Sequence, residues 1–500
     1  MANGILIKRF SLRQWLRYHI LQKKLNTAFG WILLSLLGAL MVYGVVMVDY
    51  KIGPIVIVCV SAFLLFVLIM KYPYFGLYFL IAFSSITTVI DRLVTLPVPS
   101  GTFIELITYL EFLSILLKYD KKRNIDLKFW KNPITIGLYV LFGFYLIELF
   151  NPSMFSQLGW FSFFRKQLSY FVFYYICYSL LDSRARIIYF VRFMILLCTL
   201  LALYACKQQV FGYAGFELRW IGTGGGFALL LQAGLLRKFS VFSDPATSGI
   251  LFASISMLCI ILFIRTDDKK ERVWLGVAGI INLLGYSYSG TRTATLMIIA
   301  GICLYCISTL YEKRTIRFFI YSVLTVTALM VMPYQNVITN RILSTFEGTK
   351  DQSLAIRDFD RHQVQPYIQD HPIGGGIFTC GFEGPKYNHG HYLEYLQPDS
   401  GYMKTVAEEG GIGLALLLIF YFIVMRHGYH YFYRAKDPVI RNYYIALLIM
   451  MFTLLVAQYA QMAITQCPVV LFFQAIMVIF IKLADFDTDP QTKPITTIQN

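Results

Sequence analysis

Runs of about 20 apolar residues follow one another along almost the whole of this 500-residue chain. A helix needs about 17–25 such residues to cross the hydrocarbon core of a bilayer. Only helices and closed barrels satisfy every backbone polar group in lipid, and runs of this length are typical of helices. The sequence therefore predicts an all-α polytopic membrane protein with about 12–14 transmembrane helices. The fourteen candidate spans lie near residues 29–48, 54–70, 75–90, 103–117, 133–150, 168–181, 187–204, 247–264, 273–288, 293–309, 316–332, 410–425, 440–458 and 467–482.

The composition excludes several other classes of protein. Hydrophobic residues make up 57% of the chain and charged residues 14%, against about 45–50% and about 25% in soluble domains. These values exclude an ordinary soluble enzyme, a disordered chain and a disulfide scaffold. Most of the nine cysteines lie inside apolar runs, which favours packing over metal or redox chemistry. We expect one transmembrane domain over residues 29–482, between a basic N-terminal tail (1–28) and a C-terminal tail (483–500).

The distribution of lysine and arginine predicts the orientation in the membrane. Cytoplasmic loops carry an excess of these residues, and most of the 44 fall on one side when the N-terminus is placed inside. Both tails are then cytoplasmic, and two long segments, 205–246 and 333–409, lie outside. The basic N-terminal tail suits contact with anionic membrane lipids. Because the remaining positive charge is spread over the membrane loops, nucleic acid is not an expected partner.

Arginines on the predicted outer face run against this trend. They are candidates for binding a phosphate-containing substrate, because a guanidinium group grips phosphate oxygens in a bidentate manner. An arginine at the end of a span can equally reach the membrane interface without binding anything. Asp244 precedes Pro245, a pattern typical of a helix start with Asp as the N-cap. The outer arginines are Arg219, Arg237, Arg292, Arg357 and Arg361.

The outer segment at 333–409 carries candidates for a catalytic base. His389, His391 and Asp399 are of the residue types that accept a proton from a hydroxyl. A His-x-His pair can bind a metal, but no third and fourth ligand follow at a suitable spacing, so no metal site is expected. Glu111 lies inside a predicted span. Such an acid is a functional candidate by default, paired with an arginine or marking a proton path.

Three ordered blocks of sequence are similar to those of the O-antigen polymerase and O-antigen ligase superfamily of bacterial envelope glycosyltransferases. Together they cover roughly residues 235–415, and the N-terminal half matches only as a hydrophobic multi-span region. The blocks are Arg237-x-x-Ser240-x-Phe242-Ser243-Asp244-Pro245, then Ser289-Gly290-Thr291-Arg292-Thr293-Ala294, then Arg357…Pro372-x-Gly374-x-Gly376…Glu408-x-Gly410-x-x-Gly413.

This resemblance implies a GT-C-like helical bundle with a long periplasmic loop. It also implies an inverting transferase that needs no metal or cofactor and acts at the periplasmic face of the inner membrane. The donor would be an undecaprenyl-diphosphate-linked oligosaccharide. Arg237 and Arg292 fall on family positions implicated in holding its diphosphate. The acceptor would be a glycan or a lipid, and a chain-length regulator is a further expected partner.

The resemblance leaves the exact reaction open. In ligases the base is thought to be a histidine shortly before the closing Glu-x-Gly, and here Asp399 stands near that place. This departure favours a polymerase that extends O-antigen, capsule or exopolysaccharide. The base remains open among His389, His391 and Asp399. The alternatives are a ligase that moves glycan to lipid A core or another acceptor, and a transporter of lipid-linked sugar. A transporter would place basic residues along a path through the bilayer, whereas the arginines named above gather outside.

Overall fold

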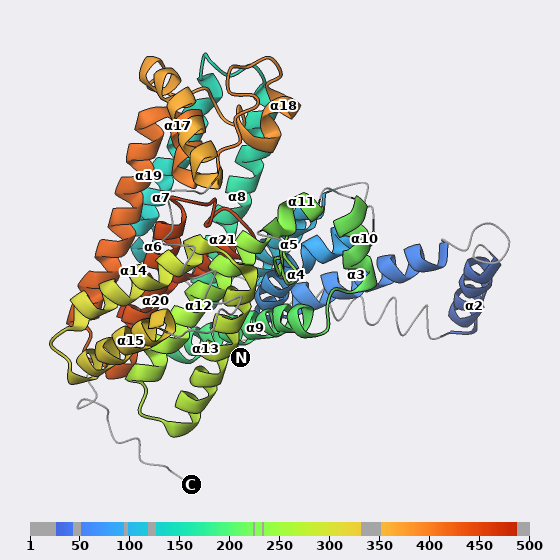
Figure 1. The fold of residues 1–500 in the computed structure, drawn as a ribbon. Coiled ribbons are helices and arrows are strands. Elements are labelled where there is room, and N and C mark those ends of the chain that lie inside the picture. Colours follow the sequence, from blue (N-terminus) through green and yellow to red (C-terminus); the bar gives the residue numbers. More distant parts are fainter. Residues whose placement is uncertain are drawn as a thin grey trace, which may run out of the picture. The chain divides into compact units, whose positions relative to one another are not determined.

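The computed structural model describes residues 27–43, 52–94, 99–118, 127–223, 226–232, 235–331 and 352–487. The described chain is almost entirely helical (Figure 1). It divides into two compact units, Met1–Lys71 and Tyr72–Asn500. The first unit contains helices α2 (Ala28–Tyr43) and α3 (Ile52–Lys71), which carry two of the predicted spans. Most of both predicted tails, 1–26 and 488–500, lies outside the described residues.

The second unit holds the other twelve predicted spans, each in one helix, so the all-α prediction is confirmed. Among the described helices of the whole chain, seven are long and apolar enough to cross a membrane. The elements of the second unit are α4 (Pro73–Leu93), α5 (Gly101–Leu117), α6 (Leu127–Lys131), α7 (Pro133–Ile147), η3 (Glu148–Phe150), α8 (Gln157–Leu180), α9 (Arg184–Val210), α10 (Gly215–Thr223), α11 (Gly226–Leu230), β1 (Leu231–Gln232), β2 (Leu235–Leu236), α12 (Pro245–Arg265), α13 (Lys269–Ser289), α14 (Arg292–Thr309), α15 (Lys313–Val331), α17 (Gln352–Asp370), η5 (Gly381–Glu383), α18 (Gly384–Tyr387), α19 (Gly401–Arg434), α20 (Pro438–Ala457) and α21 (Val469–Asp485).

Helix α12 lies at the centre of the second unit. Its most apolar 18-residue window is 83% buried, and it packs against α9, α13, α14 and α20. A helix that is hydrophobic on all sides is typical of such a fully enclosed position. The pair β1 and β2 is a short antiparallel hairpin in which Leu231 faces Leu236. It belongs to the segment before α12, which the sequence placed on the outer face.

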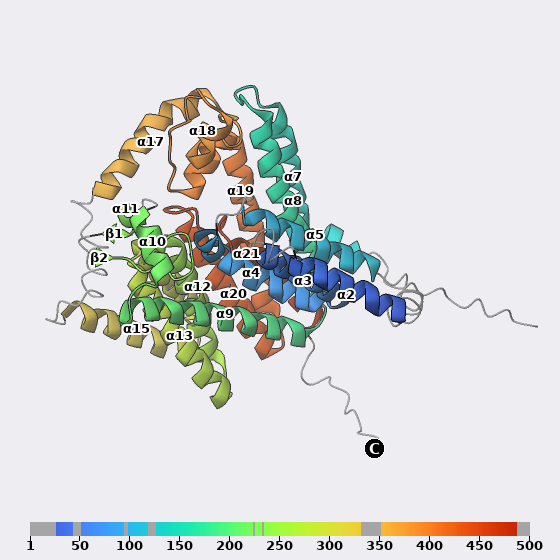
Figure 2. The same cartoon turned by 90° about the vertical axis from the view of Figure 1, so that its right-hand side faces the viewer.

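Several predicted boundaries differ from the helix ends, and two of these differences bear on the outer segments. Helix α9 continues to Val210, into the predicted outer segment. Helix α19 begins at Gly401, nine residues before its predicted span, because Ser400 caps it by accepting a hydrogen bond from the Met403 N–H group (3.3 Å). The charged and glycine-rich stretch before residue 410 is thus helical although it is not apolar. Figure 2 shows α17 beside this first part of α19.

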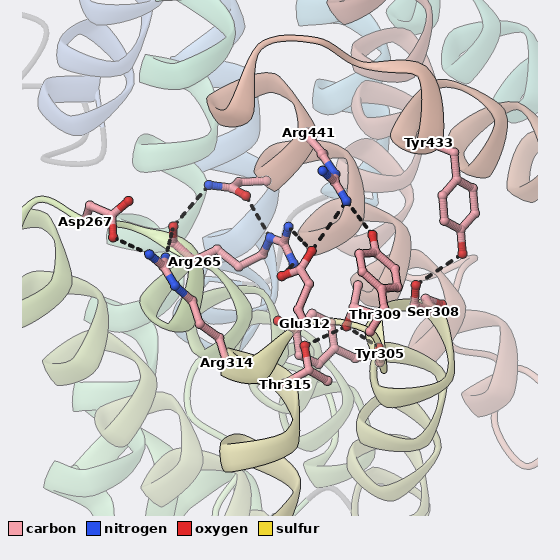
Figure 3. Close-up of polar contacts among 12 residues, drawn as sticks. Arg265, Asp267, Tyr305, Ser308, Thr309, Glu312, Arg314, Thr315, Tyr433 and Arg441 are labelled. Atoms are coloured by element: carbon pink, nitrogen blue, oxygen red, sulfur yellow. Dashed lines mark hydrogen bonds and ion pairs between the residues drawn. The ribbon is translucent and has the colours of Figure 1, made fainter.

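Ion pairs join several helices at the end of the second unit that the sequence predicts to be cytoplasmic. Figure 3 shows the largest group, in which the buried Arg265 of α12 makes two hydrogen bonds of 3.0 Å to Glu312 between α14 and α15. Arg441 of α20 reaches the same carboxylate at 3.4 Å. The Arg265 Nε group donates to Asn442 at 2.7 Å. One carboxylate therefore connects α12, the α14–α15 turn and α20.

We expect replacement of Glu312 by alanine to destabilise the protein. Arg265 is only 7% exposed, and a buried charge that loses its partner costs about 3 kcal/mol or more. Asp267→Ala is the matched control, because its pair with Arg314 (2.8 Å) is exposed and such pairs contribute less than about 1 kcal/mol. Thermal unfolding of the purified protein in detergent measures both changes. Equal losses in the two variants would contradict the structural role of Glu312.

Candidate functional site

Arg237 connects two of the sequence blocks that lie far apart in the chain. Its Nε group donates to the main-chain oxygen of Ser289 at 2.8 Å, and its Nη2 group donates to the Thr291 hydroxyl at 3.0 Å. These partners flank Gly290 in the turn between α13 and α14, and Gly290 has the left-handed φ of 62° that favours glycine. The Thr291 hydroxyl in turn donates to the Pro245 carbonyl at 2.9 Å. The blocks around Arg237 and Arg292 therefore form one structure.

Gly249 on α12 allows this close approach. A Cβ atom at this position would lie 2.3 Å from the Ser289 hydroxyl and 2.6 Å from that of Thr291. Both distances are far below van der Waals contact, so only glycine lets α12 pack directly on the α13–α14 turn. Arg292 is the first residue of α14 and follows Thr291 directly. It is therefore held beside the segment that carries Arg237.

Asp244 caps α12, as the Asp-Pro pattern predicts. Its carboxylate accepts hydrogen bonds from the Thr247 N–H group (2.8 Å) and from the Ser243 hydroxyl (2.9 Å). The Thr247 hydroxyl also contacts the side chain of Gln466, in the connection between α20 and α21. Asp244 thus positions the start of the helix, and a role in binding substrate is not required to explain it.

Arg92 is a residue of this region that the sequence analysis missed. It lies at the end of α4, and its guanidinium stacks 4.1 Å from the Trp220 ring and 4.4 Å from the Phe239 ring. The same group donates to the main-chain oxygens of Phe242 and Ser243. Cation–π contacts of this kind stabilise a partly desolvated arginine. The sequence signal was a charged residue at the predicted outer end of a span.

Gln208 of α9 holds the middle of the same segment. Its amide oxygen accepts from the Ser240 N–H group (2.9 Å), and its amide nitrogen donates to the Ser240 carbonyl (2.9 Å). Ser240 has a φ of 55°, unusual for a residue other than glycine, and this two-sided hydrogen bonding holds it there. Gln208 also donates to the buried Glu217 of α10 at 2.7 Å. Arg219 lies two residues further along α10 and is exposed.

The third sequence block forms a main-chain junction with α19. Helix α19 is broken at Gly410, which has φ 69° and ψ −171°. The glycine-rich loop crosses this break, and hydrogen bonds run from Gly375 N to Ala407 O (2.9 Å), from Gly376 N to Glu408 O (2.8 Å) and from Gly411 N to Pro372 O (3.0 Å). A Cβ atom on Gly410 would lie 2.1 Å from the Pro372 oxygen. Gly374 and Gly410 are therefore required by backbone contact.

Buried acidic side chains surround the break in α19. Glu408 accepts a hydrogen bond from the Cys380 thiol (3.2 Å) and lies 3.8 Å from the Lys404 ammonium. Glu409 and Glu148 are also buried, and Asn151 donates to Glu148 at 2.9 Å. Within the described residues, no group of three or more His, Cys, Asp or Glu side chains is arranged to hold a metal ion. The cluster is best explained as part of the junction.

Glu111 lies away from this junction, on α5. It is fully buried, and neither carboxylate oxygen has a hydrogen-bond partner among the described residues. Helix α5 packs against α4 and α8. Within the part of the chain that the structure describes, Glu111 therefore has no arginine partner.

The two candidate histidines have different surroundings. The buried His391 accepts a hydrogen bond at Nδ1 from the Leu393 N–H group (3.1 Å), and its Nε2 lies 3.4 Å from the Tyr367 hydroxyl. Burial lowers the pKa of His391 below its ordinary value, and repulsion from the nearby His371 lowers it further. Because Nδ1 is occupied by a backbone donor, His391 is held as the neutral ring with its proton on Nε2. This arrangement does not suit a proton acceptor.

His389 has an exposed ring and a carboxylate partner. Its Nδ1 lies 2.7 Å from Glu394, and the ring is 81% exposed. Glu394 also accepts a hydrogen bond from the Gly390 N–H group at 2.8 Å. The hydrogen bond from His389, and to a smaller extent the one from Gly390, lowers the pKa of Glu394. A carboxylate on Nδ1 orients the ring and leaves Nε2 to accept a proton. The sequence analysis named His389 and missed Glu394.

Asp399 and Arg361 line a single small pocket at the start of α19. Tyr459, from the connection between α20 and α21, lines it as well. The Arg361 Nη1 group donates to the Tyr459 hydroxyl at 3.3 Å. The backbone of Arg357 belongs to α17, one turn before Arg361, and its side chain lies outside the described residues. The structure therefore brings Asp399 together with one of the predicted phosphate-binding arginines.

We expect Gly410→Ala to disrupt the junction. Its backbone conformation is nearly exclusive to glycine, which costs another residue about 1–3 kcal/mol, before the clash with Pro372 adds to it. Gly411→Ala is the control, because a Cβ atom there has nothing within 4 Å. Thermal unfolding in detergent should show a large loss for the first variant and no loss for the second. Equal stability of both variants would rule out the junction as described.

Comparison with protein families places this region in a known group. Residues 277–418 match the family model described as O-antigen ligase. None of the curated proteins matches the chain. The matched segment contains the α13–α14 turn with Arg292, the glycine-rich loop and the break in α19, whereas Arg237 precedes it. The match therefore supports the predicted resemblance to the O-antigen polymerase and ligase superfamily.

Proposed function

We propose that this protein polymerises undecaprenyl-diphosphate-linked oligosaccharide at the periplasmic face of the inner membrane, to build O-antigen, capsule or exopolysaccharide. The observation that carries this proposal is the pair of hydrogen bonds from Arg237 to Ser289 and Thr291. They hold Arg237 against the turn that begins with Ser289 and ends at Arg292. Arg237 is thus bonded to the residue directly before Arg292, at the start of α14.

This arrangement suits a diphosphate leaving group. Guanidinium groups bind phosphate oxygens through charged hydrogen bonds, and the N-termini of α12 and α14 add partial positive charge. Charge builds up on the diphosphate as its bond to the sugar breaks, and fixed cations placed there stabilise the transition state. The arginines can therefore take the role that a metal has in other transferases. Gly249 and Gln208 keep the segment in place, so the cations are positioned before the substrate arrives.

We assign the general base to His389, oriented by Glu394. The acceptor hydroxyl would pass its proton to Nε2 of His389 while its oxygen attacks the anomeric carbon. The bond from that carbon to the diphosphate breaks at the same time, and the lipid diphosphate leaves toward Arg237 and Arg292. Attack opposite to the leaving group inverts the anomeric centre. The Nδ1 contact of 2.7 Å to Glu394 stabilises the imidazolium that results.

A histidine base is also the feature that favours the alternative of a ligase. The two reactions differ in the acceptor, so a deletion strain separates them. Surface glycan should be resolved on a gel while lipid-linked intermediates are analysed in parallel. A polymerase deletion leaves single repeat units on the acceptor and no ladder. A ligase deletion leaves full-length polymer on the undecaprenyl carrier, and an unchanged glycan profile would contradict both proposals.

We expect Arg237→Ala and Arg292→Ala each to lower glycan transfer by about 100-fold or more, as removal of one transition-state donor does in other enzymes. Lysine at either position should restore part of the activity, because it keeps the positive charge but cannot bind two phosphate oxygens in the bidentate manner of a guanidinium group. Lys386→Ala, exposed on α18, is the control. Immunoblots of membranes establish that each variant is present. Normal glycan ladders from a strain that carries both arginine changes would rule out the proposal that these arginines bind the diphosphate.

We expect His389→Ala to lower activity by about 100- to 10,000-fold, the range for removal of a general base. Glu394→Gln should cost less, because the amide still holds the ring without stabilising its charge. His362→Ala is the control, since this exposed histidine of α17 hydrogen-bonds only the adjacent turn through the Asp358 carbonyl. Glycan ladders from complemented deletion strains report all three variants. Full activity of His389→Ala would show that another residue is the general base.

A further inference from the structure

A small pocket lies where α17, the start of α19 and the α20–α21 connection meet. Both an acidic and a basic side chain line it, together with an aromatic ring and apolar groups. The lining includes Arg361, Leu396, Pro398, Asp399, Met403 and Tyr459. This mixture differs from the region of Arg237 and Arg292, where cationic groups dominate.

The aromatic wall of the pocket is fixed in orientation. The Arg361 Nη1 group donates to the Tyr459 hydroxyl at 3.3 Å, and the guanidinium carbon lies 5.0 Å from the ring centre. Arg361 thus covers one face of the ring. Tyr459 is nevertheless 60% exposed, and the face away from Arg361 can accept the apolar face of a ligand.

The opposite wall is rigid because α19 is tied to the end of α20. Gly401 N and the Ser400 hydroxyl both donate to the Gln458 carbonyl, at 3.0 and 3.3 Å. The Tyr402 hydroxyl donates to the Leu455 carbonyl at 2.9 Å. Asp399 directly precedes the cap residue Ser400, so its carboxylate is carried on an anchored backbone. The pocket is therefore preformed, as ligand pockets usually are.

We propose that the open mouth of this pocket binds one sugar ring of the acceptor glycan, which would lie over the lining side chains and not inside them. A sugar ring has an apolar face of C–H groups, which would stack on Tyr459, and a rim of hydroxyl groups. The Asp399 carboxylate would accept hydrogen bonds from neighbouring hydroxyls, and Arg361 would donate to ring or hydroxyl oxygens. Asp399 disfavours a phosphate ligand, because a second negative charge close to it is repelled. This proposal rests on the proposed function, for which it supplies the acceptor site.

The position of the pocket relative to the proposed base supports this assignment. Leu396 lines the pocket and follows Glu394 by two residues, which limits the separation of their Cα atoms to about 7 Å. Glu394 holds His389. Seven residues after Tyr459, Gln466 contacts Thr247 at the start of α12. The pocket and the partner of the proposed base are thus carried on neighbouring backbone, and the α20–α21 connection links the pocket to the helix that begins beside Arg237.

Binding of free glycan tests the proposal without requiring turnover. The probe is a set of oligosaccharides of one to three repeat units, prepared by partial acid hydrolysis of the producing strain's own surface polysaccharide. Full-length protein in detergent is titrated with it in a calorimeter. We expect Tyr459→Ala to weaken binding by about tenfold or more, and Asp399→Asn to weaken it by a similar factor. Tyr459→Phe should retain most of the affinity, because the ring remains.

Two control variants separate this proposal from the function on which it rests. Tyr392→Ala removes an exposed aromatic ring of the outer segment 333–409, one that stacks on Tyr367, and should leave binding unchanged. Arg292→Ala should abolish transfer and leave binding unchanged. If Tyr459→Ala binds glycan with wild-type affinity, or if the wild-type protein binds none, the pocket is not a sugar-binding site, even if Arg292 proves essential for transfer. If Arg292→Ala is active while Tyr459→Ala binds glycan weakly, the arginines do not bind the diphosphate, and the sugar-binding role of the pocket is supported.

Discussion

Hydrogen bonds between two stretches of main chain hold the outer segment to the helical bundle. They form where the loop around Gly374 crosses the break of α19 at Gly410, and they leave no room for a side chain at either glycine. The loop that follows carries His389, Glu394 and Asp399. Because its first residues are fixed against α19 through backbone atoms, the geometry of all three proposed functional side chains depends on this junction.

The two ends of the bundle are stabilised by different interactions. At the predicted cytoplasmic end, ion pairs such as Arg265 with Glu312 join α12, α20 and the α14–α15 turn. At the other end, the charged groups of Arg92 and Arg237 are bound to main-chain oxygens and aromatic rings. Carboxylates of Glu217 and Asp244 act on Arg92 as well, so the contrast between the two ends lies in the main-chain and aromatic contacts that the arginines add.

The sequence was sufficient to predict the helices and the order of the functional blocks. Hydrophobic runs locate spans because lipid leaves the backbone few alternatives, and each of the fourteen overlaps one helix. The meeting of Arg237 with the Arg292 turn followed only from the family resemblance. The sequence could not separate His389 from His391, because the difference lies in their partners Glu394 and Leu393. Arg92, Gln208 and Tyr459 were missed because their contacts come from distant parts of the chain.

The break in α19 also affects how the protein responds to its membrane. The helix has 34 residues, a length of about 51 Å at 1.5 Å per residue, against about 30 Å of hydrocarbon. Residues 401–409 are bonded to the outer loop and to α20, while the part after Gly410 is the apolar span. A bilayer of different thickness changes the tilt of a span. Because the same loop is bonded to Ala407 and Glu408 before the break and to Gly411 after it, the break is clamped, and a change of tilt has to be taken up by the apolar part of α19 that follows.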